Sequence, residues 1–407
     1  MNLSTESMKL NQNVSELLSR LSESATLAMA RKSRELKEQG HEVISLSLGE
    51  PDFDTPDFIK DAAKEGIDQN YTHYMPVPGY PDFRESISRK FERDNKLKYS
   101  PEQIVVSTGA KQSLANLLLA IVNPGDEVVL PAPYWVSYIE MVKMAGATPV
   151  VIPTSIEDDY KVSAEKLEGY LNEKTRMLIF SSPCNPSGSV YSESELRGWA
   201  EVIAKYPNLV AVSDEIYEHI NYTENHFSLA SIDEIYPQVV TVNGVSKSFA
   251  MTGWRIGYIG APEWIAKACN KLQGQFTSGA SGISQRAAKA AVEADPSVTD
   301  EMKATFLKRR NRMTEMLSEI EGVEVNQPKG AFYLFPRVSS FFGKSYHGET
   351  IKDSNDLAEY ILTEAHVATV SGEAFGSPEC LRLSYAASEA ELVEAVKRMK
   401  KALNQLS

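Results

Sequence analysis

Two charged residues, Asp214 and Lys247, each follow a short apolar run with the composition of a buried strand. They lie 33 residues apart, a spacing that fits one strand, one crossover and the next strand. Both side chains are therefore expected at the carboxyl edge of one sheet, where open α/β sheets bind ligands. On these two segments alone, a plain ion pair at the sheet rim is a sufficient interpretation.

Further segments supply groups that suit an anion. A turn at Gly109 and Ala110 separates a predicted strand from a predicted helix over residues 112–122, and the first amides of such a helix would face a phosphate. Arg255 stands eight residues after the lysine, and Arg382 lies in an apolar run near the C-terminus. The planar guanidinium fork suits phosphate or carboxylate. Individually, these features are also explained by a common turn and by surface ion pairs.

A rigid turn follows another apolar run. Pro183 and Pro186 bracket Asn185 there, and because each proline fixes its own φ, the turn can aim the asparagine amide into a site. Without knowledge of its neighbours in space, the segment indicates only a turn.

The elements that must position these residues alternate along the chain. Beyond residue 100, short β-rich runs alternate with helical patterns, which is typical of crossover units on a mostly parallel sheet. Seven runs qualify as strands: 104–107, 127–130, 148–152, 177–181, 210–213, 239–242 and 256–259. Several are unbroken Val, Ile and Leu runs, so we expect a central sheet covered by helices on both faces.

The length of 407 residues predicts more than one packed unit. We predict an N-terminal segment 1–48, a large domain 49–298 and a small C-terminal domain 299–407. A long amphipathic helix at 299–321 opens the small domain. Strand-like pieces at 330–335 and 380–385 and a final helix at 388–406 follow, and the amphipathic stretch 25–40 is expected to pack on this unit.

Composition and charge exclude several classes of protein. The chain is 42% apolar and 24% charged, which is ordinary globular usage rather than that of a disordered chain. The net charge is −13 and no basic patch is concentrated anywhere, which argues against nucleic acid and anionic membranes as partners. No apolar run approaches the roughly 18 residues of a membrane span, and the first twenty residues contain no apolar signal core. We therefore expect a cytoplasmic protein.

The cysteines and histidines give no sign of a metal site. Cys184, Cys269 and Cys380 are widely spaced and form no CxxC pair, and none of the six histidines has metal-ligand spacing. A GxSxG nucleophile elbow is also absent from the sequence. We expect neither metal hydrolysis, nor serine hydrolysis, nor a disulfide framework.

Taken in order, these segments resemble the fold-type-I pyridoxal-phosphate enzymes, specifically class I aminotransferases of the aspartate aminotransferase group. The resemblance spans nearly the whole chain, through LSLGEPDF at 46–53, YMPVPG at 74–79, PYWVSY at 133–138, NPSG at 185–188, SDEIY at 213–217, SK at 246–247 with Arg255, and LRLS at 381–384. It implies an α/β fold with a large domain, whose mostly parallel seven-stranded sheet is flanked by helices, and a smaller α+β domain.

The resemblance also implies pyridoxal phosphate as the cofactor and assigns the catalytic roles. Lys247 would form the resting Schiff base, pass it to the substrate amine and then carry the proton between the substrate Cα and the cofactor C4′. Asp214 would hold the ring nitrogen protonated, because only the protonated ring withdraws electrons strongly. Tyr217 and Asn185 would donate hydrogen bonds to the phenolic oxygen, and Trp135 would stack on the ring.

The cofactor phosphate would be shared between two subunits. By resemblance it rests on the backbone amides of Gly109, Ala110 and Lys111 and on Arg255, together with Tyr74 of a neighbouring chain, which implies a homodimer. The chain departs from one form of the family pattern at Gly244, where that form has a serine that contacts the phosphate. The phosphate is therefore expected to have one donor fewer or a different arrangement here.

The expected substrates are amino acids and 2-oxo acids. Arg382 would clamp the substrate α-carboxylate, with Gly49, Trp135 and Asn185 around the same group. Lys111, Ser24 and Thr26 match the residues that hold a distal carboxylate in one branch of the family. We expect L-aspartate and 2-oxoglutarate to give oxaloacetate and L-glutamate by a ping-pong reaction through the pyridoxamine form. Three alternatives stay open: a broader aminotransferase that accepts prephenate or aromatic 2-oxo acids, a lyase on the same scaffold, and a pyridoxal-phosphate-binding regulatory domain.

Overall fold

The computed structural model describes residues 14–223 and 225–407. Its central element is a seven-stranded sheet of order β2-β8-β7-β6-β5-β3-β4. The strands are β2 (Ile104–Thr108), β3 (Glu127–Pro131), β4 (Thr148–Ile152), β5 (Thr175–Ser181), β6 (Val210–Asp214), β7 (Val239–Gly244) and β8 (Ile256–Gly260). All seven predicted strands are confirmed. β8 runs antiparallel to β2 and β7, and the other neighbours are parallel.

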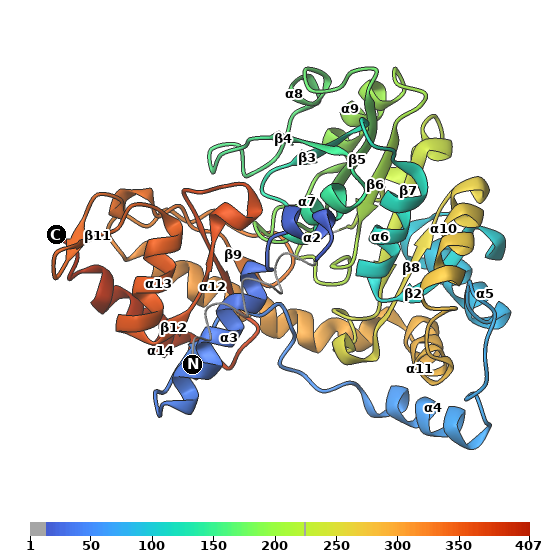
Figure 1. The fold of residues 1–407 in the computed structure, drawn as a ribbon. Helices are drawn as coiled ribbons and strands as arrows, with labels where there is room; N and C mark the ends of the chain where they lie inside the picture. Colours follow the sequence, from blue (N-terminus) through green and yellow to red (C-terminus); the bar gives the residue numbers. More distant parts are fainter. Residues whose placement is uncertain (1–13, 224) are drawn as a thin grey trace, which may run out of the picture.

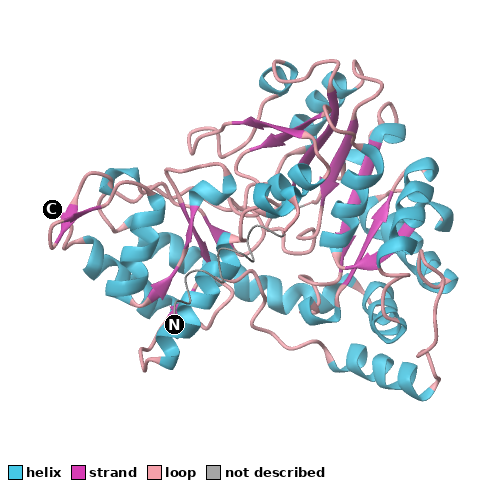
Figure 2. Ribbon diagram, viewed as in Figure 1, coloured by secondary structure: helices cyan, strands magenta, loops and turns pink. Residues whose placement is uncertain are grey.

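Helices cover both faces of this sheet (Figures 1 and 2). One apolar layer packs the sheet against α6 (Ala110–Ile121), α7 (Ser137–Met144) and α10 (Glu263–Phe276). The layer on the opposite face uses α4 (Asp57–Asp68), α5 (Pro81–Lys90), α8 (Ala164–Glu168), α9 (Glu193–Ile203) and α11 (Gly282–Glu293). Successive residues of a strand point to opposite faces, so these near-continuous apolar strands serve both layers.

A second apolar core belongs to the C-terminal part of the chain. It packs a three-stranded antiparallel sheet of order β13-β14-β9 against three helices. The strands are β9 (Tyr333–Leu334), β13 (Val370–Ser371) and β14 (Leu381–Ser384), and the helices are α12 (Asp300–Ser318), α13 (Ser354–Ala365) and α14 (Glu389–Leu403). The predicted final helix starts where expected, because Ser388 and Glu391 form a capping box.

The N-terminal residues join this second core. After the short α2 (Glu16–Arg20), α3 (Ala25–Glu38) places Met29 and Leu36 against Leu362 and Ala368. The strand β1 (Ile44–Ser45) pairs in parallel with β12 (Val367–Ala368). The amphipathic stretch 25–40 therefore packs on helix and strand residues of the C-terminal part of the chain. Residues 1–13 of the predicted N-terminal segment lie outside the described residues, and the domain limits at 48 and 298 stay a prediction.

One predicted strand is shorter in the structure. The piece predicted at 330–335 is a strand only at β9, and it does not begin at 330 because Ala331 has φ +57°, which does not continue an extended strand. The carbonyl of Ala331 instead accepts hydrogen bonds from the Tyr222 and Tyr385 hydroxyls.

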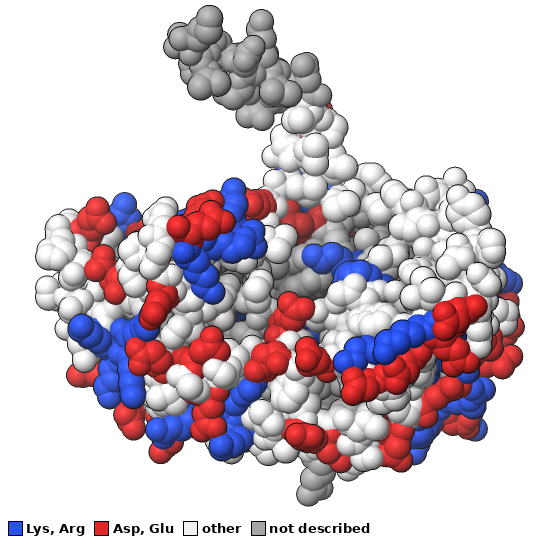
Figure 3. Space-filling model, turned by 90° about the horizontal axis from the view of Figure 1, so that it is seen from below, with Lys and Arg blue, Asp and Glu red and all other residues white. Residues whose placement is uncertain are grey.

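Charge and hydropathy of the described residues agree with the composition. On the face drawn in Figure 3, Lys and Arg side chains alternate with Asp and Glu, and no large area has a single sign. No helix in ranges 14–223 and 225–407 is long and apolar enough to cross a bilayer. The three cysteines are free and buried.

Candidate active site

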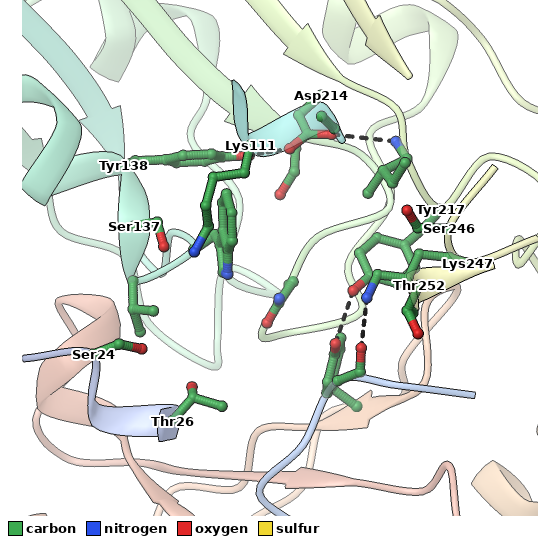
Figure 4. Close-up of a pocket in the computed structure, with 18 of the residues that line it drawn as sticks. Ser24, Thr26, Lys111, Ser137, Tyr138, Asp214, Tyr217, Ser246, Lys247 and Thr252 are labelled. Carbon is green, nitrogen blue, oxygen red and sulfur yellow. Dashed lines mark hydrogen bonds between the residues drawn. The ribbon is translucent and has the colours of Figure 1, made fainter. Parts of the chain in front are cut away.

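A pocket opens at the carboxyl edge of the parallel strands, facing the C-terminal core (Figure 4). The large sheet contributes residues that follow or end its strands: Ala110, Lys111, Ser181, Asn185, Asp214, Tyr217 and Lys247. The small antiparallel sheet contributes Tyr333 and Arg382. Ser24 and Thr26, at the start of α3, close the remaining side. The structure thus brings together most of the residues that the sequence singled out.

Asp214 is buried at the end of β6, and its carboxylate is held on both oxygens. The Tyr138 hydroxyl donates to Oδ2 at 2.7 Å, and the Ile216 amide donates to Oδ1 at 3.3 Å. Burial raises the pKa of Asp214 to about 6, although both hydrogen bonds oppose that rise. The carboxyl group is therefore ionised above about pH 6, where it can hold a cationic partner.

Lys247 lies beyond β7 and reaches the opposite wall of the pocket. Its Nζ donates to the backbone oxygen of Gly49 at 2.5 Å. Burial lowers the pKa of Lys247 to about 8, so a useful fraction of the amine is neutral near neutral pH. A neutral amine is the form that can attack a carbonyl carbon or accept a proton.

The predicted anion seat has the shape that a phosphate requires. Gly109 caps α6 with φ +81°, and a Cβ there would lie 2.5 Å from Arg255 Nη2. Arg255 itself has φ +56°, and its Nη1 donates to the Thr252 carbonyl at 2.9 Å. The guanidinium is thus held beside the first amides of α6, which have no partner within their own helix.

Gly244, where one form of the family pattern has a serine, is closely packed. A Cβ at this position would meet the Ile256 carbonyl oxygen at 2.9 Å and the Gly257 Cα at 3.0 Å. A serine would therefore require the backbone of β8 to move. This packing explains why glycine suits the position here.

Arg382 is almost fully buried at 1% exposure. Its Nη1 donates to Asn185 Oδ1 at 3.1 Å and its Nη2 to the Ser47 carbonyl at 2.5 Å. The guanidinium lies 4.7 Å from the ring centroid of Tyr333, and Nε has no hydrogen-bond partner among the described residues. Burial lowers the pKa of Arg382, yet the group stays cationic because arginine starts so high.

Tyr217 is buried beside Lys247, and its hydroxyl lies 2.8 Å from that of Tyr333. A Cβ on Gly49 would come within 2.2 Å of the Tyr333 hydroxyl, so only glycine allows this approach. Burial raises the pKa of Tyr217 well above its usual value, and the hydroxyl therefore stays protonated and able to donate.

Lys111 and Trp135 form a further wall. The ammonium of Lys111 lies 4.9 Å from the ring centroid of Trp135, and Figure 4 shows it pointing to the side of the pocket that Ser24 and Thr26 line. Burial and the nearby Arg255 lower the pKa of Lys111. Ser24 is the N-cap of α3, but its side chain makes no capping hydrogen bond and is free to contact a ligand.

Tyr74 lies outside this pocket. Its side chain is 97% exposed and lines a surface hollow with residues of the 71–75 and 281–283 segments. Within one chain it therefore makes no contact with the site.

Several pocket residues were not predicted from the sequence, and Tyr138 and Tyr333 are the two whose hydroxyls meet predicted site residues. Tyr138 was visible in the PYWVSY motif, where its spacing from Trp135 places it on the first turn of α7. Tyr333 comes from a short strand of the C-terminal core, and no local pattern indicated that it would meet Tyr217.

Comparisons with known proteins agree with this geometry. Residues 41–399 match the family described as aminotransferase class I and II, and the chain belongs to that family. It is a pyridoxal-phosphate-dependent aminotransferase of the aspartate aminotransferase group.

Three similar proteins illustrate the relationship. The bifunctional aspartate aminotransferase and glutamate/aspartate-prephenate aminotransferase of Petunia hybrida is 47% identical, over 98% of this chain and 85% of its own length. The aspartate aminotransferase of Rhizobium meliloti has a TM-score of 0.94 and 39% identity, covering 97% of this chain and 100% of the other. The Thermus thermophilus enzyme with maleate has a TM-score of 0.90 and 38% identity, covering 96% and 99%.

The residues present fit the cofactor of this family. Gly109 leaves a cradle beside Arg255 that a Cβ would fill. A buried acid, a buried amine with a lowered pKa and a tryptophan ring line the same pocket. Ser181 Oγ is buried there with no hydrogen-bond partner among the described residues. These are the donors, acceptors and apolar wall that a phosphorylated pyridine ring needs.

Proposed function

We propose that this chain is an aspartate aminotransferase that exchanges the amino group of L-aspartate with 2-oxoglutarate in two half-reactions. A single observation carries the proposal. Lys111, Ser24 and Thr26 line one side of the pocket, and Arg382 lines the same pocket together with Asp214 and Lys247. Two separate cationic groups suit a substrate with two carboxylates.

Pyridoxal phosphate, when bound, would supply an aldehyde for the substrate amine and an electron-withdrawing ring. The backbone amides of Gly109, Ala110 and Lys111 and the guanidinium of Arg255 would hold its phosphate. Trp135 would cover one face of the ring, and Asp214 would face the ring nitrogen. Tyr217 and Asn185 would donate hydrogen bonds to the phenolic oxygen. Asn185 already accepts from Arg382, so it would link the cofactor to the substrate clamp.

Lys247 would act as the base of the reaction. Its amine has a pKa of about 8 because of burial, which keeps a neutral fraction available near pH 7. Nζ would then accept the proton from the substrate Cα and deliver it to the cofactor C4′. Asp214 would support this step, because its ionised carboxylate would stabilise positive charge on the ring nitrogen of the bound cofactor.

Arg382 would bind the α-carboxylate that every amino-acid substrate carries. Its buried guanidinium is oriented by the Ser47 carbonyl and by Asn185, which reduces the ordering cost on binding. Lys111 would pair with the distal carboxylate of aspartate or glutamate, assisted by the hydroxyls of Ser24 and Thr26. The related Thermus thermophilus enzyme has been solved with maleate, a molecule with two carboxylates.

The proposal includes a homodimer in the cytoplasm. Tyr74 is fully exposed, and the exposed apolar residues Phe58, Ile67 and Phe276 suit contact with a second chain. A second subunit would bring its own Tyr74 to the phosphate seat. Mixing a Tyr74→Phe chain with a Lys247→Ala chain and measuring the activity of the hybrid would test this shared site.

The visible spectrum of the protein loaded with pyridoxal phosphate tests the proposed reaction. Adding L-aspartate without a keto acid should convert the bound cofactor to its amino form and release one oxaloacetate for each site. L-alanine, which lacks the distal carboxylate, is the matched control and should react far more slowly. An unchanged spectrum with L-aspartate, or equal rates with both amino acids, would refute the proposal.

A broader specificity is the second candidate, because the Petunia hybrida relative is described as acting on prephenate as well. Comparing kcat/KM for oxaloacetate and prephenate as amino acceptors separates the two. A prephenate value within about tenfold of that for oxaloacetate would favour the dual enzyme.

A further inference from the structure

A buried group of charged and polar side chains lies behind the wall that carries Asp214. We name the rear cluster as Lys90, Asn95, Glu215, Glu218, His226 and Ser228. Glu215 is 1% exposed, Lys90 3% and Glu218 6%, so the charges are removed from solvent. None of the six residues lines the active-site pocket. Such a group is costly to bury, and its retention needs a reason.

The rear cluster and the active site share one backbone turn. Asp214 and Tyr217 line the pocket, whereas their neighbours Glu215 and Glu218 belong to the rear cluster. The turn is fixed by the Glu218 amide, which donates to the Glu215 carbonyl at 2.9 Å. The Glu215 amide donates to the Val242 carbonyl on β7, also at 2.9 Å. Anything that displaces the two glutamates therefore displaces the two pocket residues.

Glu215 depends on one cation. Its carboxylate accepts from the hydroxyls of Ser213 at 3.0 Å and Ser228 at 2.6 Å, and it lies 2.8 Å from His226 Nε2. No lysine or arginine of the described residues forms a salt bridge with it. Burial disfavours the charged imidazole, but the attraction of Glu215 outweighs burial and raises the pKa of His226. When protonated, His226 is thus the counter-charge of Glu215.

The other charges near His226 are balanced among themselves. Lys90, at the end of α5, pairs with Glu218 and donates to Asn95 Oδ1 at 2.7 Å. Asn95 Nδ2 in turn donates to Glu218 at 2.7 Å and to Ser228 at 3.2 Å.

Two further groups lie at the edge of the rear cluster. Asp94 is bound by Arg93, and His219 Nε2 lies 3.3 Å from Glu218. Although carboxylates and histidines meet here, the Lys90 ammonium already lies among them as the cation. Glu218 has Lys90 and His219 as partners, whereas His226 is the one partner of Glu215 among the salt bridges of the described residues.

We propose that His226 is a positioning residue for the transamination, which neutralises Glu215 from behind and thereby keeps Asp214 ionised. Glu215 directly follows Asp214, and its negative charge favours the protonated form of that neighbour. With His226 protonated, the two charges cancel and Asp214 can face the cofactor ring as a carboxylate. This role rests on the proposed function, because it concerns the acid that would hold the ring nitrogen.

Three variants separate this electrostatic role from a merely structural one. His226→Gln leaves Glu215 uncompensated, Glu215→Gln removes the charge that needs compensation, and the double variant removes both. Two readouts are measured across pH: the dissociation constant of pyridoxal phosphate from the apo protein, and the visible spectrum of the loaded protein. Melting temperatures of the apo proteins report structural damage separately.

His226→Gln is expected to raise the pH midpoint of cofactor association and the pKa of the visible transition, each by about one pH unit at an effective dielectric of about 20. The double variant should return both to their wild-type values, even if its melting temperature stays lowered. Equal shifts of the pH midpoint in His226→Gln and in the double variant, or no shift in either of them, would overturn the role of His226. A wild-type protein with no visible cofactor band would instead refute the proposed function.

Discussion

Removing the Tyr138 hydroxyl tests how the protein keeps Asp214 ionised from the pocket side. The two side chains are buried and joined by a hydrogen bond of 2.7 Å, and the pKa of Asp214 is about 6. A hydrogen bond to a charged group contributes about 1.5–3 kcal/mol. Since about 1.4 kcal/mol corresponds to one pKa unit, Tyr138→Phe should raise the pKa of Asp214 by about one to two units.

The assay is the affinity of the apo protein for pyridoxal phosphate between pH 5 and 9. The sign follows from the group: cofactor binding needs the carboxylate, so affinity falls as the pH drops through the pKa of Asp214. The wild-type midpoint should lie near pH 6 and that of the variant near pH 7 to 8, with a several-fold weaker affinity at pH 7.

Tyr99→Phe is the matched control for this experiment. Tyr99 is also buried and also loses one hydroxyl hydrogen bond, to Thr241 at 3.1 Å, but it does not line the pocket. Its midpoint should stay at the wild-type value. An unchanged midpoint in Tyr138→Phe, or the same shift in both variants, would refute the reasoning.

Three further predictions follow from individual side chains. The pKa of Lys247 is lowered from 10.5 in the unfolded chain to about 8 in the folded protein, so the unfolding free energy rises as the pH increases from about 8 to 10.5. Lys247→Met should remove this part of the pH dependence and raise the unfolding free energy of the apo protein at pH 7 by about 3 kcal/mol, measured in urea. Lys111→Val should lower kcat/KM for L-aspartate far more than for L-alanine, and equal losses would remove the case for its distal-carboxylate role. Arg382→Lys should cost about 2 kcal/mol or more in kcat/KM for both amino acids, because the buried fork loses its two oriented donors; a loss confined to L-aspartate would contradict that role.

Much of this arrangement could be predicted because strands of a doubly wound sheet are recognisable as buried apolar runs. All seven were found, and Asp214 and Lys247 stood out because a charge directly after such a run lies at the sheet edge. The resemblance to a known family then assigned roles that no spacing could give, such as that of Trp135.

The residues that sequence patterns did not predict are those that contact segments far away in the sequence. Tyr333 meets Tyr217 across 116 positions of sequence, and nothing local to either indicates the contact. Glu215 and Glu218 are charged residues of the kind that usually lie in a solvated loop, whereas the fold buries them against Lys90 and His226. The strand predicted at 330–335 starts only at Tyr333 because Ala331 has a left-handed backbone conformation, which an alanine in the sequence does not reveal.

We propose Lys247 as the residue that joins the cofactor covalently. Borohydride reduction of the protein loaded with pyridoxal phosphate, followed by peptide mass spectrometry, tests it directly. We expect one reduced pyridoxyl group for each chain, located on Lys247. Stoichiometric label on Lys111 or on any other lysine, with Lys247 unmodified, would contradict it.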